Sequence, residues 1–184
     1  MENIVDEEMI RASQRGDRVA FASLLELIYD LIFRFALKWS GNRVDAEDIT
    51  QQVCIKLASV IQQFTFKSQF TTWLYRVVMN CAHDWGRKHR RHQHDQYSEI
   101  NDEASARQSD ACIESPTELD RVLKLVDNMG KDFKDTLLLV HAEGLSHREA
   151  AEVLDVKEST VSWRLHDIKK RLSALEQSSM EATS

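Results

Sequence analysis

The chain has few of the residues that interrupt helices. Its 184 residues include one proline and five glycines, the two types that most often break or end an α-helix. Apolar residues make up 42% of the chain and recur at intervals of three and four over long stretches. We therefore predict an all-α protein.

Membrane-spanning segments and common catalytic motifs are also missing. No apolar run approaches the length needed to cross a bilayer, and the N-terminal segment MENIVDEEMI is acidic where a signal peptide would be basic and then apolar. There is no glycine-rich phosphate loop, nucleophile motif or paired set of metal ligands to indicate a helical hydrolase or phosphotransferase. The sequence predicts a cytoplasmic protein that is not an enzyme and holds no cofactor.

The cysteines are few and form no CxxC pair. Cys54, Cys81 and Cys112 fall mostly on apolar faces, which is typical of buried thiols in a reducing compartment. Histidines close to Cys81 raise the idea of a metal site, but most of them lie among arginines that would repel a cation. We expect no metal site at these histidines, which are His83, His89, His92 and His94.

Charge is arranged in blocks of one sign, which the net charge of −6 conceals. The segment 86–94 carries four basic residues and no acid, whereas 95–120 carries eight acids and one arginine. The acidic stretch is too poor in apolar residues to fold alone. We predict helical domains at 1–94 and 116–176, a flexible acidic linker at 95–115 and a disordered tail at 177–184.

The N-terminal domain is predicted to hold long amphipathic helices. Apolar residues from Phe21 to Trp39 form one stripe, with Asp17 as the N-cap. A second helix is predicted to begin with Asp45 as its cap and further acids in its first turn. A third helix starts near Phe70 and runs into the basic block.

A polar loop with embedded aromatic residues separates the second and third of these helices. In QQFTFKSQFTT, the rings of Phe64, Phe66 and Phe70 lie beside polar side chains. Such rings can stack on unpaired bases, at roughly 1 to 3 kcal/mol per base, or plug the core beneath the loop. The sequence leaves both interpretations open for each ring.

The C-terminal domain ends in a helix-turn-helix pattern, GLSHREAAEVLDVKESTVSWRL. Ser146 and Glu149 form a capping box, Asp155 tolerates a left-handed turn, and the following helix turns polar residues outward, as a major-groove recognition helix does. An ordinary αα-hairpin of a helical bundle has similar spacing. The earlier elements predicted in this domain are a capping box at Ser115–Glu118 and a helix from Asp132 to His141.

Three motifs, in this order, resemble the extracytoplasmic-function group of bacterial RNA polymerase sigma factors. They are DAEDITQQVCIKL at 45–57, FTTWLYRVVMNCAHDWGRKHRR at 70–91, and the helix-turn-helix. The resemblance spans nearly the whole chain and implies an alternative sigma factor that directs promoter-specific transcription initiation. The implied partners are core RNA polymerase, through the clamp helices of its largest subunit and its flap, promoter DNA, and an anti-sigma factor.

The resemblance assigns polymerase docking to the first motif, whose carboxylates would meet basic groups of the partner. Where the family usually has a glutamate and then an aromatic residue, this chain has Gln52 and Cys54. One hypothesis is that phosphorylation of Thr50 or Thr65 restores the missing negative charge. The implied docking residues are Asp45, Glu47, Asp48, Gln51 and Gln52.

The same resemblance gives the second motif the reading and melting of the promoter −10 element. Asn80 would hydrogen-bond a base drawn out of the stack, Phe64 would line the same pocket, and the loop 65–69 would set which base is accepted. Basic residues would contact the DNA backbone. The implied −10 residues are Phe64, Thr65, Phe66, Lys67, Ser68, Gln69, Arg76, Asn80, Arg87, Lys88, Arg90 and Arg91.

The recognition helix is implied to read the −35 element. Because the family commonly has arginines where this chain has Ser162 and Asp167, we expect an unusual target sequence, with Trp163 packing on a thymine methyl group. The main rival interpretation is a stand-alone helix-turn-helix regulator whose N-terminal domain senses a ligand. The implied −35 residues are Ser146, Lys157, Ser159, Thr160, Ser162, Trp163, Arg164, His166, Lys169 and Lys170.

Overall fold

The computed structural model divides the chain into two compact units, Met1–Cys112 and Ile113–Ser184. It describes residues 5–97, 122–123, 126–127 and 129–181, with the backbone alone described for 90–97 and 175–181. The described part is helical and contains no strand, so the prediction of an all-α fold is confirmed. The predicted linker beyond Tyr97 and the predicted capping box at Ser115–Glu118 lie outside the described residues.

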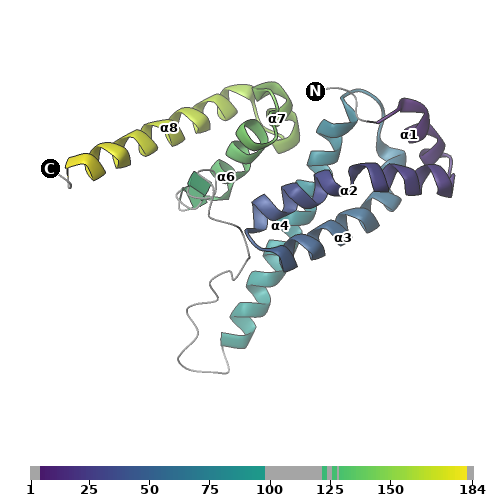
Figure 1. The fold of residues 1–184 in the computed structure, drawn as a ribbon, viewed down its shortest axis with the longest axis horizontal. Coiled ribbons are helices and arrows are strands. Elements are labelled where there is room, and N and C mark those ends of the chain that lie inside the picture. Colours follow the sequence, from purple (N-terminus) through teal and green to yellow (C-terminus); the bar gives the residue numbers. More distant parts are fainter. Residues whose placement is uncertain (1–4, 98–121, 124–125, 128, 182–184) are drawn as a thin grey trace. The chain divides into compact units, whose positions relative to one another are not determined.

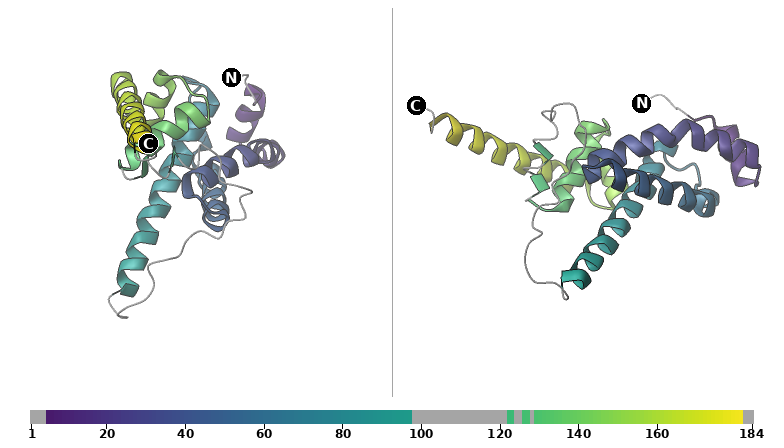
Figure 2. Two further views of the ribbon diagram at one scale, coloured as in Figure 1. Left: turned by 60° about the vertical axis from the view of Figure 1, so that its left-hand side comes forward. Right: turned by 60° about the horizontal axis from the view of Figure 1, so that its bottom comes forward.

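The first unit is built from long helices packed side by side. Figure 1 shows them in order, and Figure 2 shows the C-terminal part of α4 extending beyond its neighbours. The helix α4 continues three residues into the segment predicted as linker. The elements are α1 (Glu7–Gln14), α2 (Arg18–Ser40), α3 (Arg43–Val60), the 3₁₀ helix η1 (Ile61–Gln63) and α4 (Phe70–Tyr97).

The start of α2 confirms its predicted cap, whereas the start of α3 corrects one. Asp17 Oδ1 accepts hydrogen bonds from the first turn of α2, and Gly41 ends that helix at a φ of 78°. Helix α3 begins at Arg43 with Asn42, not Asp45, as its N-cap. Asn42 Oδ1 accepts from the Asp45 N–H at 2.8 Å, and its amide donates back to the Asp45 carboxylate. Asparagine caps as well as aspartate, and an acid three residues later completes a reciprocal pair.

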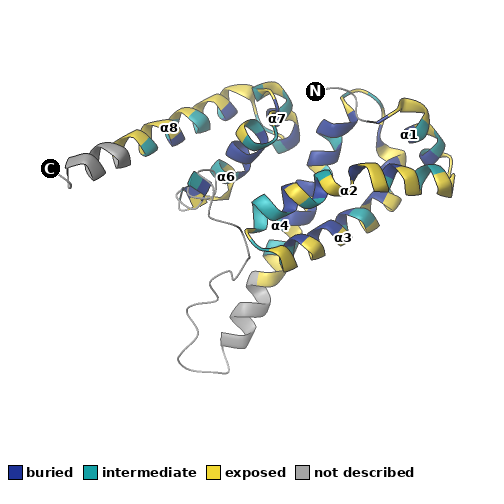
Figure 3. Cartoon of the chain, in the orientation of Figure 1, coloured by how far each residue is buried: buried dark blue, intermediate teal, exposed yellow. Residues whose placement is uncertain are grey.

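The core of the first unit lies where α2, α3 and α4 meet (Figure 3). Burying each of these large side chains contributes about 1.5–3 kcal/mol, so the apolar stripes fix how the helices pack and which faces remain outside. The buried residues include Leu24, Ile28, Ile32 and Phe35 of α2, Ile49, Val53 and Leu57 of α3, and Leu74, Tyr75 and Val78 of α4.

The second unit carries the helix-turn-helix. The helix predicted from Asp132 to His141 is α6 (Lys131–Leu137) followed by the π-helical turn η2 (Leu138–Ala142). Then come α7 (His147–Leu154) and α8 (Glu158–Glu181). Helix α8 continues into the segment 177–184 that was predicted as a disordered tail.

The predicted turn chemistry of the helix-turn-helix is present. The Ser146 hydroxyl and backbone N–H donate to Glu149 Oε2 at 2.6 and 2.8 Å, and the Glu149 N–H donates back to Ser146 Oγ. These bonds lower the pKa of Glu149, and the bond from the Ser146 hydroxyl has the larger effect. The Glu149 carboxylate is therefore ionised at neutral pH, where it accepts both bonds of the cap. Asp155 ends α7 in the left-handed conformation, at a φ of 55°. Ala150, Val161 and Leu138 fill the core beneath.

Candidate nucleic-acid interface

A groove of about 740 Å³ runs between α3 and α4. Arg76, Asn80, Asp84 and Lys88 follow one another at intervals of four residues on α4 and line this groove, because that spacing places them on one helix face. Lys56 of α3 adds a further positive charge on the opposite wall. The groove therefore combines an exposed amide with more basic than acidic side chains, as a site for a nucleic-acid strand requires.

The basic residues at the end of α4 differ in what the structure shows of them. Lys88 lines the groove, whereas the Arg87 guanidinium is paired with the Asp84 carboxylate. Arg90 and Arg91 continue the helix, but their side chains lie outside the described residues. Of the basic residues predicted to contact the DNA backbone, Arg76, Arg87 and Lys88 have described side chains, and all three lie on α4.

The aromatic loop before α4 is held by a cluster of rings. Phe64 is 5% exposed, and its ring centroid lies 4.7 Å from that of Phe66 and 5.4 Å from those of Phe70 and Trp73. Phe70 is equally buried, while Phe66 is half-buried. Phe64 and Phe70 therefore belong to the core beneath the loop, and Phe66 is partly exposed.

Phe64 and Asn80 border different hollows in the described structure, and the expectation that both meet one unpaired base stays a prediction. Phe64 borders a second hollow, of about 340 Å³, together with Phe66, Ser68 and Gln69 of the loop and Glu7 and Ile10 of α1. Asn80 lines the α3–α4 groove instead. Trp73 lines the groove and packs against the Phe64 ring, so it links the groove to the aromatic cluster. Thr65 and Lys67 are exposed on the loop that precedes α4.

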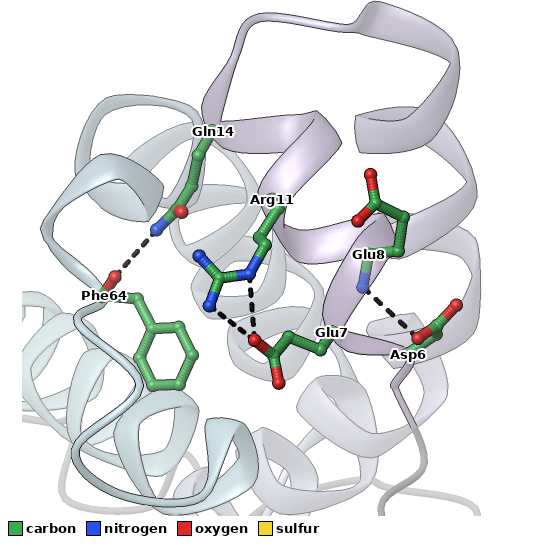
Figure 4. A network of polar contacts seen from close by, with 6 residues as sticks. All are labelled: Asp6, Glu7, Glu8, Arg11, Gln14 and Phe64. Atoms are coloured by element: carbon green, nitrogen blue, oxygen red, sulfur yellow. Dashed lines mark hydrogen bonds and ion pairs between the residues drawn. The ribbon is translucent and has the colours of Figure 1, made fainter.

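Helix α1, which the sequence analysis did not single out, contacts this loop directly (Figure 4). Gln14 Nε2 donates to the carbonyl oxygens of Ile61 at 2.9 Å and Phe64 at 2.7 Å. The Arg11 guanidinium lies 4.1 Å from the centre of the Phe66 ring and is also bound by Glu7. No local sequence signal marks these residues, because their partners lie about fifty positions away.

The exposed side of α3 carries a mixed polar and apolar face. Val44, Asp48, Gln51 and Ile55 lie at helical spacing, and Val44 and Ile55 are 70% and 67% exposed. The sequence analysis missed these two apolar residues. The signal was available, since both fall outside the inward stripe of Ile49, Val53 and Leu57.

The other predicted docking residues of α3 have additional contacts. Asp45 is bound to the cap residue Asn42, Glu47 pairs with Arg43 at 2.8 Å, and Gln52 lines the α3–α4 groove. Thr50 is fully buried, and its hydroxyl donates to the Ala46 carbonyl at 2.7 Å. The hypothesis of phosphorylation at Thr50 is therefore wrong, because a kinase cannot reach that hydroxyl in the folded domain.

The residues of α8 that face outward follow from those that are buried. Val161 and Ile168 are buried, and the helical repeat places Ser159, Trp163, His166 and Lys170 on the opposite side. Trp163 is 58% exposed, with its ring 5.7 Å from that of Phe133. Toward α7, Ser162 Oγ lies 2.9 Å from His147 Nδ1. The remaining predicted −35 residues are exposed, apart from half-buried Thr160: Ser146, Lys157 and Lys169.

Arg164 departs from the other predicted −35 residues. Its side chain is 12% exposed and donates to Asp132 Oδ2 at 3.1 Å and to Thr136 Oγ1 at 3.3 Å, both on α6. The guanidinium thus ties the recognition helix to the domain. We leave Arg164 out of the face offered to DNA.

Known protein families match both units. The Sigma-70 region 2 model matches residues 24–92, and the Sigma-70 region 4 model matches residues 119–172. The ECF RNA polymerase sigma factor SigW of Bacillus subtilis (strain 168) is 28% identical over 174 residues, which are 87% of this chain and 90% of that protein. This chain is an extracytoplasmic-function sigma factor.

Two further comparisons agree with the family. The ECF sigma factor SigE of Mycolicibacterium smegmatis is 31% identical to this sigma factor over 162 residues, 85% of this chain and 63% of that protein. The structure of the sigma factor RpoE in complex with the anti-sigma factor NepR from Bartonella quintana shares the fold, with a TM-score of 0.66 at 21% identity, over 85% of this chain and 96% of that one. The prediction of an alternative sigma factor is confirmed.

In the described part of this sigma factor, Cys81 is buried, and His83 and His89 pack against tryptophan rings. Burial raises the pKa of the Cys81 thiol, with nearby Asp84 adding to the effect, so the thiol stays protonated at neutral pH. His83 packs on Trp39, and His89 stacks on Trp85 at 4.5 Å. His92 and His94 have no described side chains. None of the described helices is long and apolar enough to cross a bilayer.

Proposed function

We propose that this sigma factor binds core RNA polymerase through α3, opens promoters at the −10 element through α4 and the preceding loop, and reads the −35 element with α8. The observation that supports this most directly is the α3–α4 groove, where exposed Asn80 lies between Arg76 and Lys88. Basic side chains hold the phosphates, and the amide offers a donor and an acceptor to a base edge. This work would take place in the cytoplasm, where polymerase and promoters are found.

Reconstitution with core polymerase tests the proposal. The chain and core enzyme are incubated with genomic fragments, and the start sites of the transcripts are mapped. Transcripts that begin downstream of one shared pair of elements are expected. If core polymerase with and without the chain gives the same transcripts, the rival of an operator-binding regulator takes its place.

The polymerase-binding face is proposed to be Val44, Asp48, Gln51 and Ile55, with an anti-sigma factor covering part of it. A polar rim around exposed apolar residues is the usual composition of a binding surface. The relative crystallised with an anti-sigma factor supports such a partner for this chain. Phosphorylation of exposed Thr65 remains a second proposed control.

Replacing Ile55 with alanine is expected to weaken binding of core polymerase by about tenfold, because one buried aliphatic side chain contributes about 1.5 kcal/mol or more to an interface. The measurement is titration of labelled chain with core enzyme. Val19→Ala is the matched control, since Val19 is also strongly exposed but lies on α2. Equal affinities for the two variants would contradict the proposed face.

Substitutions at Trp163 and Arg164 are expected to have different effects, the first on the selection of promoter DNA and the second on the stability of the domain. Trp163→Ala should reduce the preference of holoenzyme for an intact over a scrambled −35 element by roughly tenfold, and it should lower the unfolding free energy less than Arg164→Ala does. Arg164→Ala should lower the unfolding free energy of the second unit by about 1–2 kcal/mol, since it removes the guanidinium bonds to Thr136 and Asp132. Competition binding and thermal unfolding of both variants measure this, and a reversed pattern would return Arg164 to the DNA face.

A further inference from the structure

We propose that α1 is a positioning element for the −10 loop, and that Gln14 and Arg11 thereby influence which base the loop accepts. The inference rests on the proposed function, since it concerns the same loop. It starts from the bond between Gln14 and the Phe64 carbonyl drawn in Figure 4, and from a second bond between Gln14 and the Ile61 carbonyl, on the other side of the turn that leads from α3 into the loop.

Gln14 fixes the backbone at the entrance to the loop. Its terminal amide has two N–H groups, and its nitrogen lies within hydrogen-bond distance of two carbonyl oxygens, those of Ile61 in η1 and Phe64 just after it. One side chain thus holds both ends of the turn. Movement of α1 would move the point from which the loop departs.

Arg11 fixes the next part of the loop. Its guanidinium covers the Phe66 ring at 4.1 Å, and Glu7 Oε1 accepts from Arg11 Nε at 2.9 Å, which orients the guanidinium. Phe66 has a φ of 59°, in the left-handed region that bulky residues rarely adopt. A conformation of this kind persists only where the surroundings impose it, and Arg11 is one of the α1 residues in those surroundings.

The hollow beside the loop has walls from both elements. Ser68 and Gln69 supply polar groups from the loop, and Glu7 and Ile10 close the hollow from α1. The position of α1 therefore sets the shape of the space in which a base would meet Ser68 and Gln69. A change confined to α1 should alter base preference without removing any loop residue.

The test uses the full chain with core polymerase and a promoter library randomised in the −10 element. Gln14→Glu keeps the length of the side chain but replaces the donor nitrogen with oxygen, which repels the two carbonyls. We expect single-round transcription from the best promoter to fall about tenfold, and the base preference to flatten at one position of the element. Gln62→Glu is the matched control, because it introduces the same charge on the exposed side of η1.

A second variant separates positioning from folding. Arg11→Gln leaves the Gln14 bonds in place and removes the cation over Phe66, so it should flatten the same position. Core binding and thermal unfolding are measured for every variant. A uniform fall at all library sequences, or Gln14→Glu behaving as Gln62→Glu does, would overturn the inference. If the unaltered chain selects no promoter at all, the proposed function fails instead.

Discussion

Replacing Asn80 with alanine is expected to lower open-complex formation by roughly ten- to a hundredfold, because a bidentate base contact contributes about 1–3 kcal/mol. Binding of core polymerase should be retained, since Asn80 lies on α4 and, of the proposed docking residues on α3, Ile55 alone also lines the groove. Its side chain is exposed, so the unfolding free energy should change by less than about 0.5 kcal/mol. Permanganate reactivity of the melted strand measures opening, and titration with core enzyme measures docking.

Gln63→Ala is the control for this change. Gln63 also carries an exposed amide and lines the same groove, from η1. Normal opening by the Gln63 variant would show that an amide in the groove is insufficient and that the position on α4 matters. Loss of polymerase binding by the Asn80 variant would refute the assigned role.

Replacing Phe64 with alanine is expected to lower the unfolding free energy of the first unit by about 3–5 kcal/mol. The ring is almost wholly buried and contacts Phe66, Phe70 and Trp73, so its removal leaves a cavity where the loop meets α4. That loss is a large share of the stability of a small domain. Urea unfolding followed by tryptophan fluorescence measures it, with Trp73 as a nearby reporter.

Two companion variants keep the interpretation of this result clear. Phe64→Leu retains most of the volume and should recover much of the stability. Phe66→Ala removes a half-buried ring and should cost clearly less than Phe64→Ala. A Phe64→Ala protein that unfolds like the unaltered chain but melts no promoter would identify the ring as a base-stacking platform.

Local rules predicted much of the fold. Asp17 and Asp155 each act within a few residues of their own position, and the cap and the turn expected from them are present. The predicted N-cap of α3 was wrong because Asn42 and Asp45 are both residue types that cap helices. Only the hydrogen bonds between the two residues decide which of them is the cap. The apolar stripes likewise identified the buried faces.

Contacts between distant residues could not be read from the sequence. The Gln14 amide meets carbonyls 47 and 50 residues away, and Arg164 finds Asp132 at a separation of 32. An arginine near the start of a recognition helix has the same local pattern whether it points to DNA or to a neighbouring helix. The separation of Phe64 from Asn80 into different hollows is also a result of packing, which no spacing rule contains.

The anchoring of α8 bears on how promoter choice can evolve. Val161, Ile168 and Arg164 secure the helix on one side, so substitutions at Ser159 or His166 on the other side leave those anchoring contacts in place, and a substitution at Trp163 removes its contact with Phe133. If α8 reads the −35 element as proposed, substitutions at these outward positions would retarget the sigma factor without disturbing the contacts that anchor the helix. A gene duplicate could diverge in its regulon while the scaffold that presents the helix stays unchanged.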